Sequence, residues 1–213
     1  MENKKNFKNL IIAPHIDDEV LGCFSAIGKD TFILYCGYDE SHINFNWVKS
    51  RPNSTERLEE LQRLGEEYGF SYDLLYNKVN YYSIQDLIPC FEDAINKIKP
   101  EYLYIPVPSY NQDHRMVYEA CLTALRPHDV NFFVKKVLLY EQIQDLWNHN
   151  YHDFKPTFFK KLDIEDKIKG YQILASQVRS FRSPEMLRNL ASVRGIQSNM
   201  DYAEAFEILR WVE

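Results

Sequence analysis

Short apolar runs alternate with longer amphipathic segments along most of the chain. The apolar runs are rich in β-forming residues and cover residues 10–14, 31–37, 72–76, 102–106 and 134–140. The segments between them have the apolar spacing of an α-helix and cover residues 19–29, 54–68, 83–99 and 113–125. Strands that alternate with helices of this length are typical of β-α-β units. We therefore predict an α/β fold, a Rossmann-like three-layer sandwich with a mostly parallel sheet.

The last third of the chain has a different pattern. Residues 147–156 are irregular, residues 164–178 and 184–195 predict two further helices, and the C-terminus is aromatic. Neither internal repeats nor low-complexity segments occur. A chain of 213 residues has the length of one ordinary domain, so we expect residues 1–213 to form a single domain.

Composition excludes several classes of protein. The chain has 25 basic and 31 acidic residues without a basic block, which argues against nucleic acid as a partner. Its apolar runs are too short to span a membrane, and no signal peptide is recognisable. The four cysteines are widely spaced without a C-x-x-C pair, which favours free thiols in a reducing compartment. We expect a cytoplasmic protein, and the sequence leaves open whether it is an oligomer.

Metal-binding residue types follow two of the predicted strands. The first strand leads into His15, Asp17, Asp18 and Glu19, and the fourth leads into the segment 111–114, Asn-Gln-Asp-His. In a doubly wound sheet of order 3-2-1-4-5 the first and fourth strands are neighbours, and functional groups gather at the carboxyl ends of the strands. We therefore expect the two clusters to face each other.

Two imidazoles and one carboxylate form a ligand set with an open coordination position, which suits a catalytic divalent cation. The set is His15, Asp18 and His114, zinc is the first choice, and another divalent cation is possible. Asp17 is then free to accept a proton from a water molecule whose pKa the metal lowers. A simpler interpretation stays open: acidic residues are favoured in the first turn of any helix, and Asp113 could be no more than a helix cap.

The same residues resemble a known family, the LmbE-like or PIG-L-type N-acetylglucosamine deacetylases, which are zinc hydrolases on a Rossmann-like fold. The family's His-Pro-Asp-Asp-Glu motif is matched by residues 15–19, His-Ile-Asp-Asp-Glu. Its later His-x-Asp-His element is matched in part by residues 111–114. Arg57 and Glu60 resemble an Arg-x-x-Glu motif, and residues 176–177 and 203–206 also look similar to the family, so the likeness covers nearly the whole chain.

The resemblance implies a role for each matching residue. His15, Asp18 and His114 would hold zinc and Asp17 would be the general base. Arg57 would help to bind the substrate, and Asp113 would orient a neighbouring imidazole.

Two positions depart from the family pattern. Ile16 replaces a proline, which should affect loop rigidity more than chemistry. Asn111 replaces a histidine that is thought to stabilise the oxyanion or protonate the leaving amine. An asparagine can donate a hydrogen bond to an oxyanion but cannot supply a proton. We therefore expect Asn111 and the zinc ion to polarise the carbonyl, and protonated Asp17 to serve the amine.

The function that these residues favour is zinc-dependent removal of an N-acetyl, or other N-acyl, group from an amino sugar or its conjugate. The polar loop 38–53, with Tyr38, Phe45 and Trp47, is a candidate for stacking on a sugar ring. Two alternatives stay open. Asn111 could mark a catalytically impaired sugar-binding relative, and two histidines with one carboxylate also describe the ligands of non-haem iron oxygenases. A dinucleotide-dependent dehydrogenase is disfavoured because no G-x-G-x-x-G follows the first strand.

Overall fold

The computed structural model of the protein describes residues 6–40, 54–147 and 150–213. Its helices are α1 (Asp18–Cys23), α2 (Ser54–Tyr68), α3 (Ile84–Ile98), α4 (Gln112–Ala124), α5 (Ile164–Ile173) and α6 (Pro184–Ser198). Its strands are β1 (Asn9–Ala13), β2 (Thr31–Asp39), β3 (Ser71–Lys78), β4 (Tyr102–Pro106), β5 (Lys136–Tyr140), β6 (Phe158–Lys161) and β7 (Ala203–Trp211). Short 3₁₀ turns are η1 (Phe24–Ala26), η2 (Ile143–Trp147), η3 (Ala175–Gln177) and η4 (Ser180–Arg182). Most of the predicted sugar-stacking loop, including Phe45 and Trp47, lies outside the described residues.

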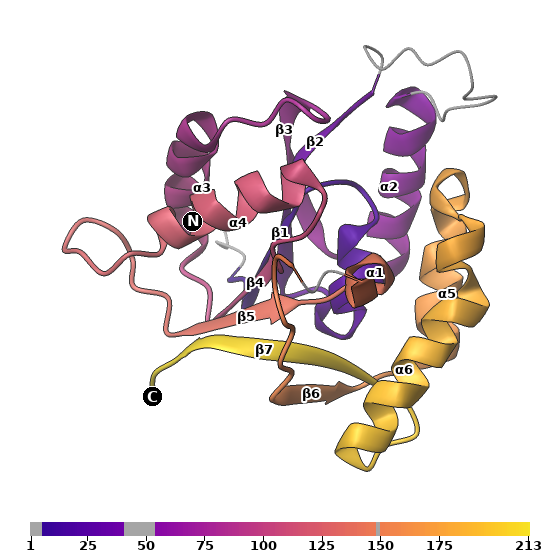
Figure 1. The fold of residues 1–213 in the computed structure, drawn as a ribbon. Helices are drawn as coiled ribbons and strands as arrows, with labels where there is room; N and C mark the ends of the chain where they lie inside the picture. Colours follow the sequence, from indigo (N-terminus) through magenta and orange to yellow (C-terminus); the bar gives the residue numbers. More distant parts are fainter. Residues whose placement is uncertain (1–5, 41–53, 148–149) are drawn as a thin grey trace.

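All seven strands belong to one sheet of order β3-β2-β1-β4-β5-β7-β6 (Figure 1). The first five strands are parallel, and β1 pairs with both β2 and β4. The predicted order 3-2-1-4-5 and the predicted α/β class are therefore confirmed. Because β1 and β4 are hydrogen-bonded neighbours, the segments that follow their carboxyl ends emerge at the same edge of the sheet.

Two antiparallel strands, β6 and β7, were not predicted. Residues 158–161 and 203–211 pair with each other, and β7 also pairs with β5. Strand β6 is only four residues long, so its sequence shows no usable periodicity. In β7 two glutamates interrupt the apolar run and its outer half is exposed. Pairing with β5 stabilises a segment whose own pattern is ambiguous.

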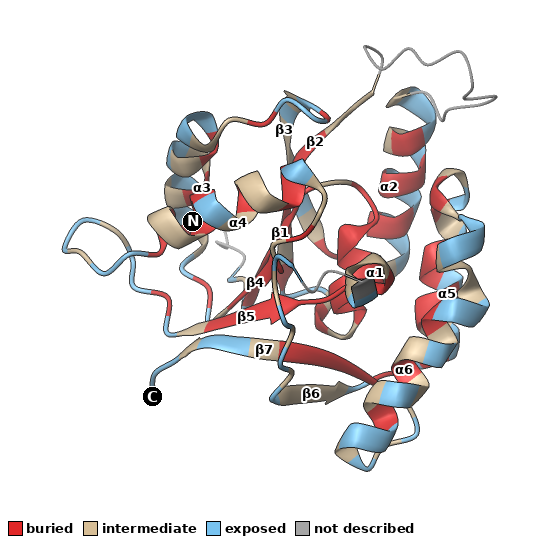
Figure 2. Cartoon of the chain, in the orientation of Figure 1, coloured by how far each residue is buried: buried red, intermediate tan, exposed pale blue. Residues whose placement is uncertain are grey.

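Helices cover both faces of the sheet, and the strands between them are the most buried part of the molecule (Figures 1 and 2). Ile11 and Ala13 of β1 face a core that includes residues of α1, α2, α5 and α6. Leu10 and Ile12 face the opposite core, which includes residues of α3 and α4. Since β1 is buried on both sides, a continuous apolar run is the expected pattern for it.

The first helix is shorter than predicted. It ends at Cys23 and continues as the single turn η1, whereas the apolar spacing predicted a helix over residues 19–29. The carboxylate of Glu204 in β7 accepts the backbone N–H groups of Phe24 and Ser25, at 3.0 and 2.7 Å. A carboxylate that binds these donors replaces the intrahelical acceptors, so the helix ends there. Glu204 is in turn paired with buried Lys167, with 2.6 Å between Nζ and Oε1.

All four cysteines are free thiols, and Cys23, Cys36 and Cys121 are buried. Across residues 6–40, 54–147 and 150–213, every helix is too short or too polar to traverse a lipid bilayer.

Candidate metal centre

His15 is held at the carboxyl end of β1 by hydrogen bonds from two tyrosines. The hydroxyl of Tyr82 donates to the carbonyl of Pro14 at 2.7 Å, and the hydroxyl of Tyr140 donates to the carbonyl of Ile12 at 2.9 Å. Both hydroxyls are buried with the end of the strand, so leaving either one unpaired would be costly. These bonds fix the direction in which the chain leaves the sheet toward His15.

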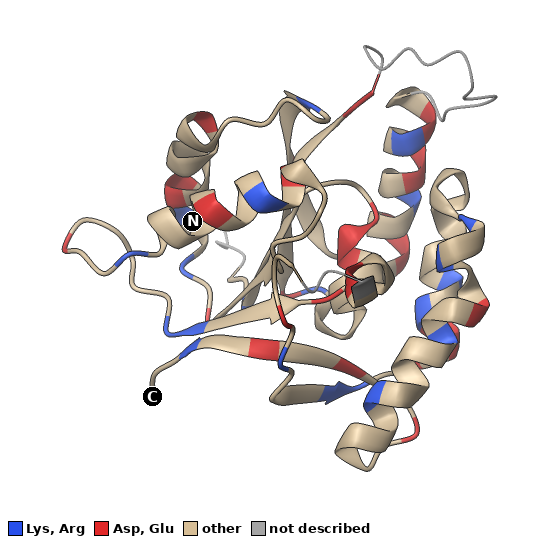
Figure 3. Ribbon diagram, viewed as in Figure 1, with Lys and Arg blue, Asp and Glu red and all other residues tan. Residues whose placement is uncertain are grey.

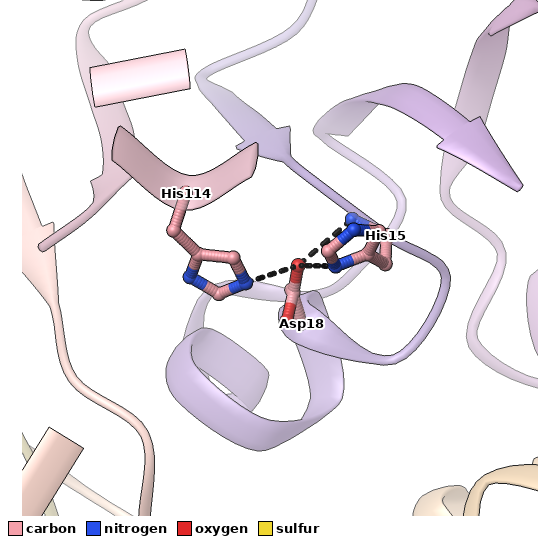
Figure 4. A group of neighbouring side chains, drawn as sticks. All are labelled: His15, Asp18 and His114. Atoms are coloured by element: carbon pink, nitrogen blue, oxygen red, sulfur yellow. Dashed lines mark hydrogen bonds and ion pairs between the residues drawn. The ribbon is translucent and has the colours of Figure 1, made fainter. Parts of the chain in front are cut away.

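His15, Asp18 and His114 converge on one point, as predicted (Figure 4). Each offers a ligand atom, and these atoms lie within 4.8 Å of one another. Oδ2 of Asp18 is 3.5 Å from Nδ1 of His15 and 3.4 Å from Nε2 of His114. A single cation can therefore contact all three side chains.

Asp18 lies at the centre of the cluster and is almost completely buried. Its Oδ2 accepts the backbone N–H of His15 at 2.8 Å, and its Oδ1 accepts a hydrogen bond from the side-chain amide of Gln142. Burial alone would raise its pKa, but the neighbouring imidazoles of His114 and His15 hold the pKa of Asp18 well below its usual value. The carboxylate is therefore ionised and available to a cation.

The second ring nitrogen of His15 is bound to Asp113. Nε2 of His15 lies 2.9 Å from Oδ2 of Asp113, and the same oxygen accepts the backbone N–H of Asn80 at 2.8 Å. Burial disfavours protonation of His15, but its hydrogen bonds to Asp113 and Asp18 outweigh burial and raise its pKa to about 10. Nδ1 of His15 is left facing Asp18, which is the arrangement that a metal ligand requires.

His114 is buried in the first turn of α4, and neither of its ring nitrogens has a hydrogen-bond partner among the described residues. Buried polar atoms are nearly always paired, so a ring with no partner at Nδ1 and only the 3.4 Å contact with Asp18 at Nε2 needs an explanation. A cation bound between Nε2 of His114, Nδ1 of His15 and the Asp18 carboxylate would account for the environment of Nε2. The donor set, two imidazoles and a carboxylate, fits zinc.

Asp17 has a different environment from Asp18. Its φ of 133° lies in a region that residues with a side chain rarely adopt, and its N–H is held by Oε2 of Glu19 at 3.0 Å. Strained backbone of this kind clusters at functional sites. Asp17 occupies the N-cap position of α1, but its side chain makes no capping hydrogen bond. The interpretation of the acidic cluster as an ordinary helix start does not account for Asp17.

The carboxylate of Asp17 instead pairs with Arg182, whose Nη1 lies 2.8 Å from Oδ2. Both side chains are nearly buried. Burial raises the pKa of Asp17, and the positive charge of Arg182 opposes this shift. The pKa of Glu19 is also raised: burial and the adjacent charge of Asp17 raise it to about 8, so Glu19 is largely protonated at neutral pH.

Arg57 and Glu60 of α2 connect that helix to the turn η3. Nη2 of Arg57 donates to Glu40 at 3.0 Å and to Gln177 at 2.9 Å. The Glu60 carboxylate accepts the backbone N–H and the hydroxyl of Ser176, at 2.8 and 2.5 Å. Residues 57–60 and 176–177, the two segments compared with family motifs in the sequence analysis, are thus in direct contact. The positive charge of Arg57 also opposes the rise in the pKa of Asp17 that burial causes.

Asn111 is the N-cap of α4. Its Oδ1 accepts the backbone N–H of Asp113 at 2.9 Å. The suggestion that Asp113 caps this helix is wrong, because the Asp113 carboxylate is turned toward His15 and Asn80. The Asn111 oxygen serves the helix, and its amide N–H groups are the part of the side chain that could serve a substrate.

Three residues near the centre were not found from the sequence: Arg182, Gln142 and Asp145. Gln142 and Asp145 follow the end of β5, so the rule that located His15 and His114 could have located them too. Arg182 lies in a turn between α5 and α6, away from any strand, and no pattern marks it. Figure 3 shows the acidic start of α1 near α2 and near the helices α5 and α6, which carry several basic residues.

No protein-family model matches the sequence, and comparison with curated protein sequences gives no match. Solved structures do match. The N,N'-diacetylchitobiose deacetylase of Pyrococcus horikoshii has a TM-score of 0.75 and 16% identity, over 97% of this chain and 85% of that chain. The 4-carboxy-2-hydroxymuconate hydratase GalB of Pseudomonas putida has a TM-score of 0.73 and 19% identity, over 97% of this chain and 99% of that chain. A deacetylase of the teicoplanin biosynthesis pathway has a TM-score of 0.67 and 14% identity, over 93% and 96%.

These similarities define the fold. The chain shares nearly its whole length with enzymes that include two deacetylases and a hydratase. At such low identity the comparison carries the architecture alone, and the chemistry has to be argued from the side chains at the sheet edge.

Proposed function

We propose that this protein is a zinc-dependent N-acyl hydrolase of the LmbE-like or PIG-L type, which removes an acetyl group from an amino sugar or its conjugate. The observation that carries the proposal is the convergence of His15, Asp18 and His114, whose ligand atoms lie within 4.8 Å of one another, while the carboxylate of Asp17 pairs with Arg182. The fold shared with two deacetylases supports the choice of reaction.

The ligand atoms would be Nδ1 of His15, a carboxylate oxygen of Asp18 and Nε2 of His114. A zinc ion held there supplies Lewis acidity, which polarises an amide carbonyl and lowers the pKa of a water molecule to about 7. Asp113 orients His15, and Gln142 orients Asp18.

Asp17 performs the proton transfers in this proposal. It accepts a proton from the attacking water as the new C–O bond forms, and it returns that proton to the nitrogen as the C–N bond breaks. Acetate and a free amine are the products. Arg182 fixes the Asp17 carboxylate in place. The amide N–H groups of Asn111 would donate to the developing oxyanion. Arg57 is buried and its Nη2 is bound to Glu40 and Gln177, so it would help to bind the substrate through its positive charge.

A direct test is acetate and amine release from a panel of N-acetylated amino sugars, such as N-acetylglucosamine and diacetylchitobiose. Chelation of the protein should abolish release and added zinc should restore it. The Asp17→Asn variant is the matched control, because it should keep the metal and lose the activity. Turnover that is indifferent to chelation, or no release from any member by zinc-loaded protein, would reject the deacetylase.

Three other outcomes separate the competing functions. Water addition to an unsaturated carboxylate without amide cleavage would indicate a hydratase, in line with the fold of GalB. Oxygen consumption that depends on ferrous iron would indicate an oxygenase. Binding of an N-acetylated sugar without turnover would indicate a sugar-binding relative.

A further inference from the structure

The two histidines of the centre differ in how their outward nitrogens are satisfied. His15 has Nδ1 toward Asp18 and Nε2 on the Asp113 carboxylate. His114 has Nε2 toward Asp18, but its Nδ1 is buried and has no hydrogen-bond partner among the described residues. A histidine that ligates a metal almost always donates its other N–H to a carboxylate, a carbonyl or water. His114 therefore needs a partner on its Nδ1 side.

Asp145, in the turn η2, has a buried acceptor oxygen without a partner among the described residues. Its Oδ2 accepts the backbone N–H of Gln142 at 2.9 Å, but its Oδ1 is buried and without a partner among the described residues. Burial raises the pKa of Asp145 to about 6, and the His114 imidazole is the strongest opposing influence. The geometric link is Gln142, which holds Asp145 through its backbone N–H and contacts Asp18, the carboxylate 3.4 Å from Nε2 of His114.

The segment that carries Asp145 is already part of the centre. The side chain of Gln142 donates to Oδ1 of Asp18, while its backbone N–H holds Asp145. One short stretch after β5 thus orients one ligand and presents a free carboxylate oxygen near another.

We propose that Asp145 is a positioning residue for the metal centre: its carboxylate accepts a hydrogen bond from Nδ1 of His114, directly or through one water molecule, when the cation is bound. Asp145 would then serve His114 as Asp113 serves His15, so that each imidazole ligand is oriented by its own carboxylate. This inference rests on the proposed function only in requiring that the three-residue centre binds a divalent cation.

The test is the zinc affinity of metal-free protein, measured by competition with a chromophoric chelator. Asp145→Ala should weaken zinc binding about 10-fold to 100-fold, and Asp145→Asn less, since its amide oxygen can still accept a hydrogen bond. Asp163→Ala is the matched control. Asp163 also accepts backbone N–H groups, those of Glu165 and Asp166 at the start of α5, and its loss should leave zinc affinity unchanged.

A spectroscopic signature separates orientation from general destabilisation. In zinc-loaded protein labelled with ¹⁵N-histidine, the Nδ1 proton of His114 should be protected from exchange, and Asp145→Asn should reduce that protection while the backbone spectrum is retained. Zinc affinity and proton protection that are both unchanged in Asp145→Asn would overturn the inference, even if Asp145→Ala does not fold. Wild-type protein that binds no zinc would instead reject the metal centre itself, so the two failures are distinguishable.

Discussion

The Nε2 atom of His15 lies 2.9 Å from the Oδ2 atom of Asp113, although the two residues are 98 positions apart in the chain. This contact fixes the His15 imidazole, which we propose as a metal ligand, and it connects the end of β1 to α4. Asp113→Ala should therefore weaken zinc binding by about 10-fold to 100-fold. Asp113→Asn should weaken it less, because one acceptor oxygen remains. A chelator competition titration of the two variants measures the difference, and equal affinity in wild type and Asp113→Ala would contradict the role.

Asp17 is the residue expected to carry the proton transfers without holding the metal. Asp17→Asn should lower kcat by about 100-fold to 10,000-fold, the range that a positioned general base contributes. Zinc content should stay that of the wild type, because the ligand atoms belong to other side chains. Steady-state kinetics combined with metal analysis check both parts. Loss of the metal in this variant would mean that Asp17 is a ligand.

Asn111 caps α4 through its side-chain oxygen, and we propose a second role for its amide N–H groups, as donors to the oxyanion. Asn111→Asp keeps a capping oxygen and removes the N–H donors, so it should lower kcat by about 10-fold to 1000-fold with little change in thermal stability. Asn111→Ala removes both functions and should also cost about 0.5–2 kcal/mol of stability. If Asn111→Asp is fully active, Asn111 acts only as a helix cap.

Glu19 should make the stability of the metal-free protein depend on pH. Its pKa is raised by burial from 4.5 to about 8, so between these values the folded state keeps a proton that the unfolded chain has lost. Stability from this group therefore falls as pH rises from about 4.5 to about 8. Glu19→Gln keeps an oxygen for the Asp17 N–H and has no such proton.

The advantage of Glu19→Gln over wild type in free energy of unfolding should grow across that pH window, by at most about 1.4 kcal/mol per pKa unit. Urea unfolding in the presence of a chelator, at pH 5, 6.5 and 8, measures it. A constant difference across the three pH values would show that Glu19 is not buried as a neutral acid.

The central part of the fold could be predicted because its sequence pattern is local. Most of the parallel strands are buried apolar runs, and each of β1 to β4 is followed by a helix, so the order β3-β2-β1-β4-β5 followed from general topology rules. The strands β6 and β7 could not be predicted, because their pairing with each other and with β5 overrides a weak local signal. The early end of α1 likewise depends on Glu204, 180 positions after Phe24.

In the site, too, some residues follow from local sequence pattern and others depend on distant contacts. His15, Asp18 and His114 follow strand ends and could be brought together by the sheet-edge rule alone. Arg182 reaches Asp17 from a turn between two helices, and its place depends on how α5 and α6 pack rather than on a motif. Asn111 was assigned chemistry from its place in a motif, whereas its capping bond emerges only from the backbone geometry of α4.

The zinc content of the purified protein tests the central claim most directly. Metal analysis after dialysis against trace zinc should find about one zinc ion per chain, and His15→Ala, Asp18→Ala and His114→Ala should each reduce it sharply while Asp17→Asn retains it. Wild-type protein without zinc, or a zinc content at the wild-type level in two of these three single variants, would contradict the account.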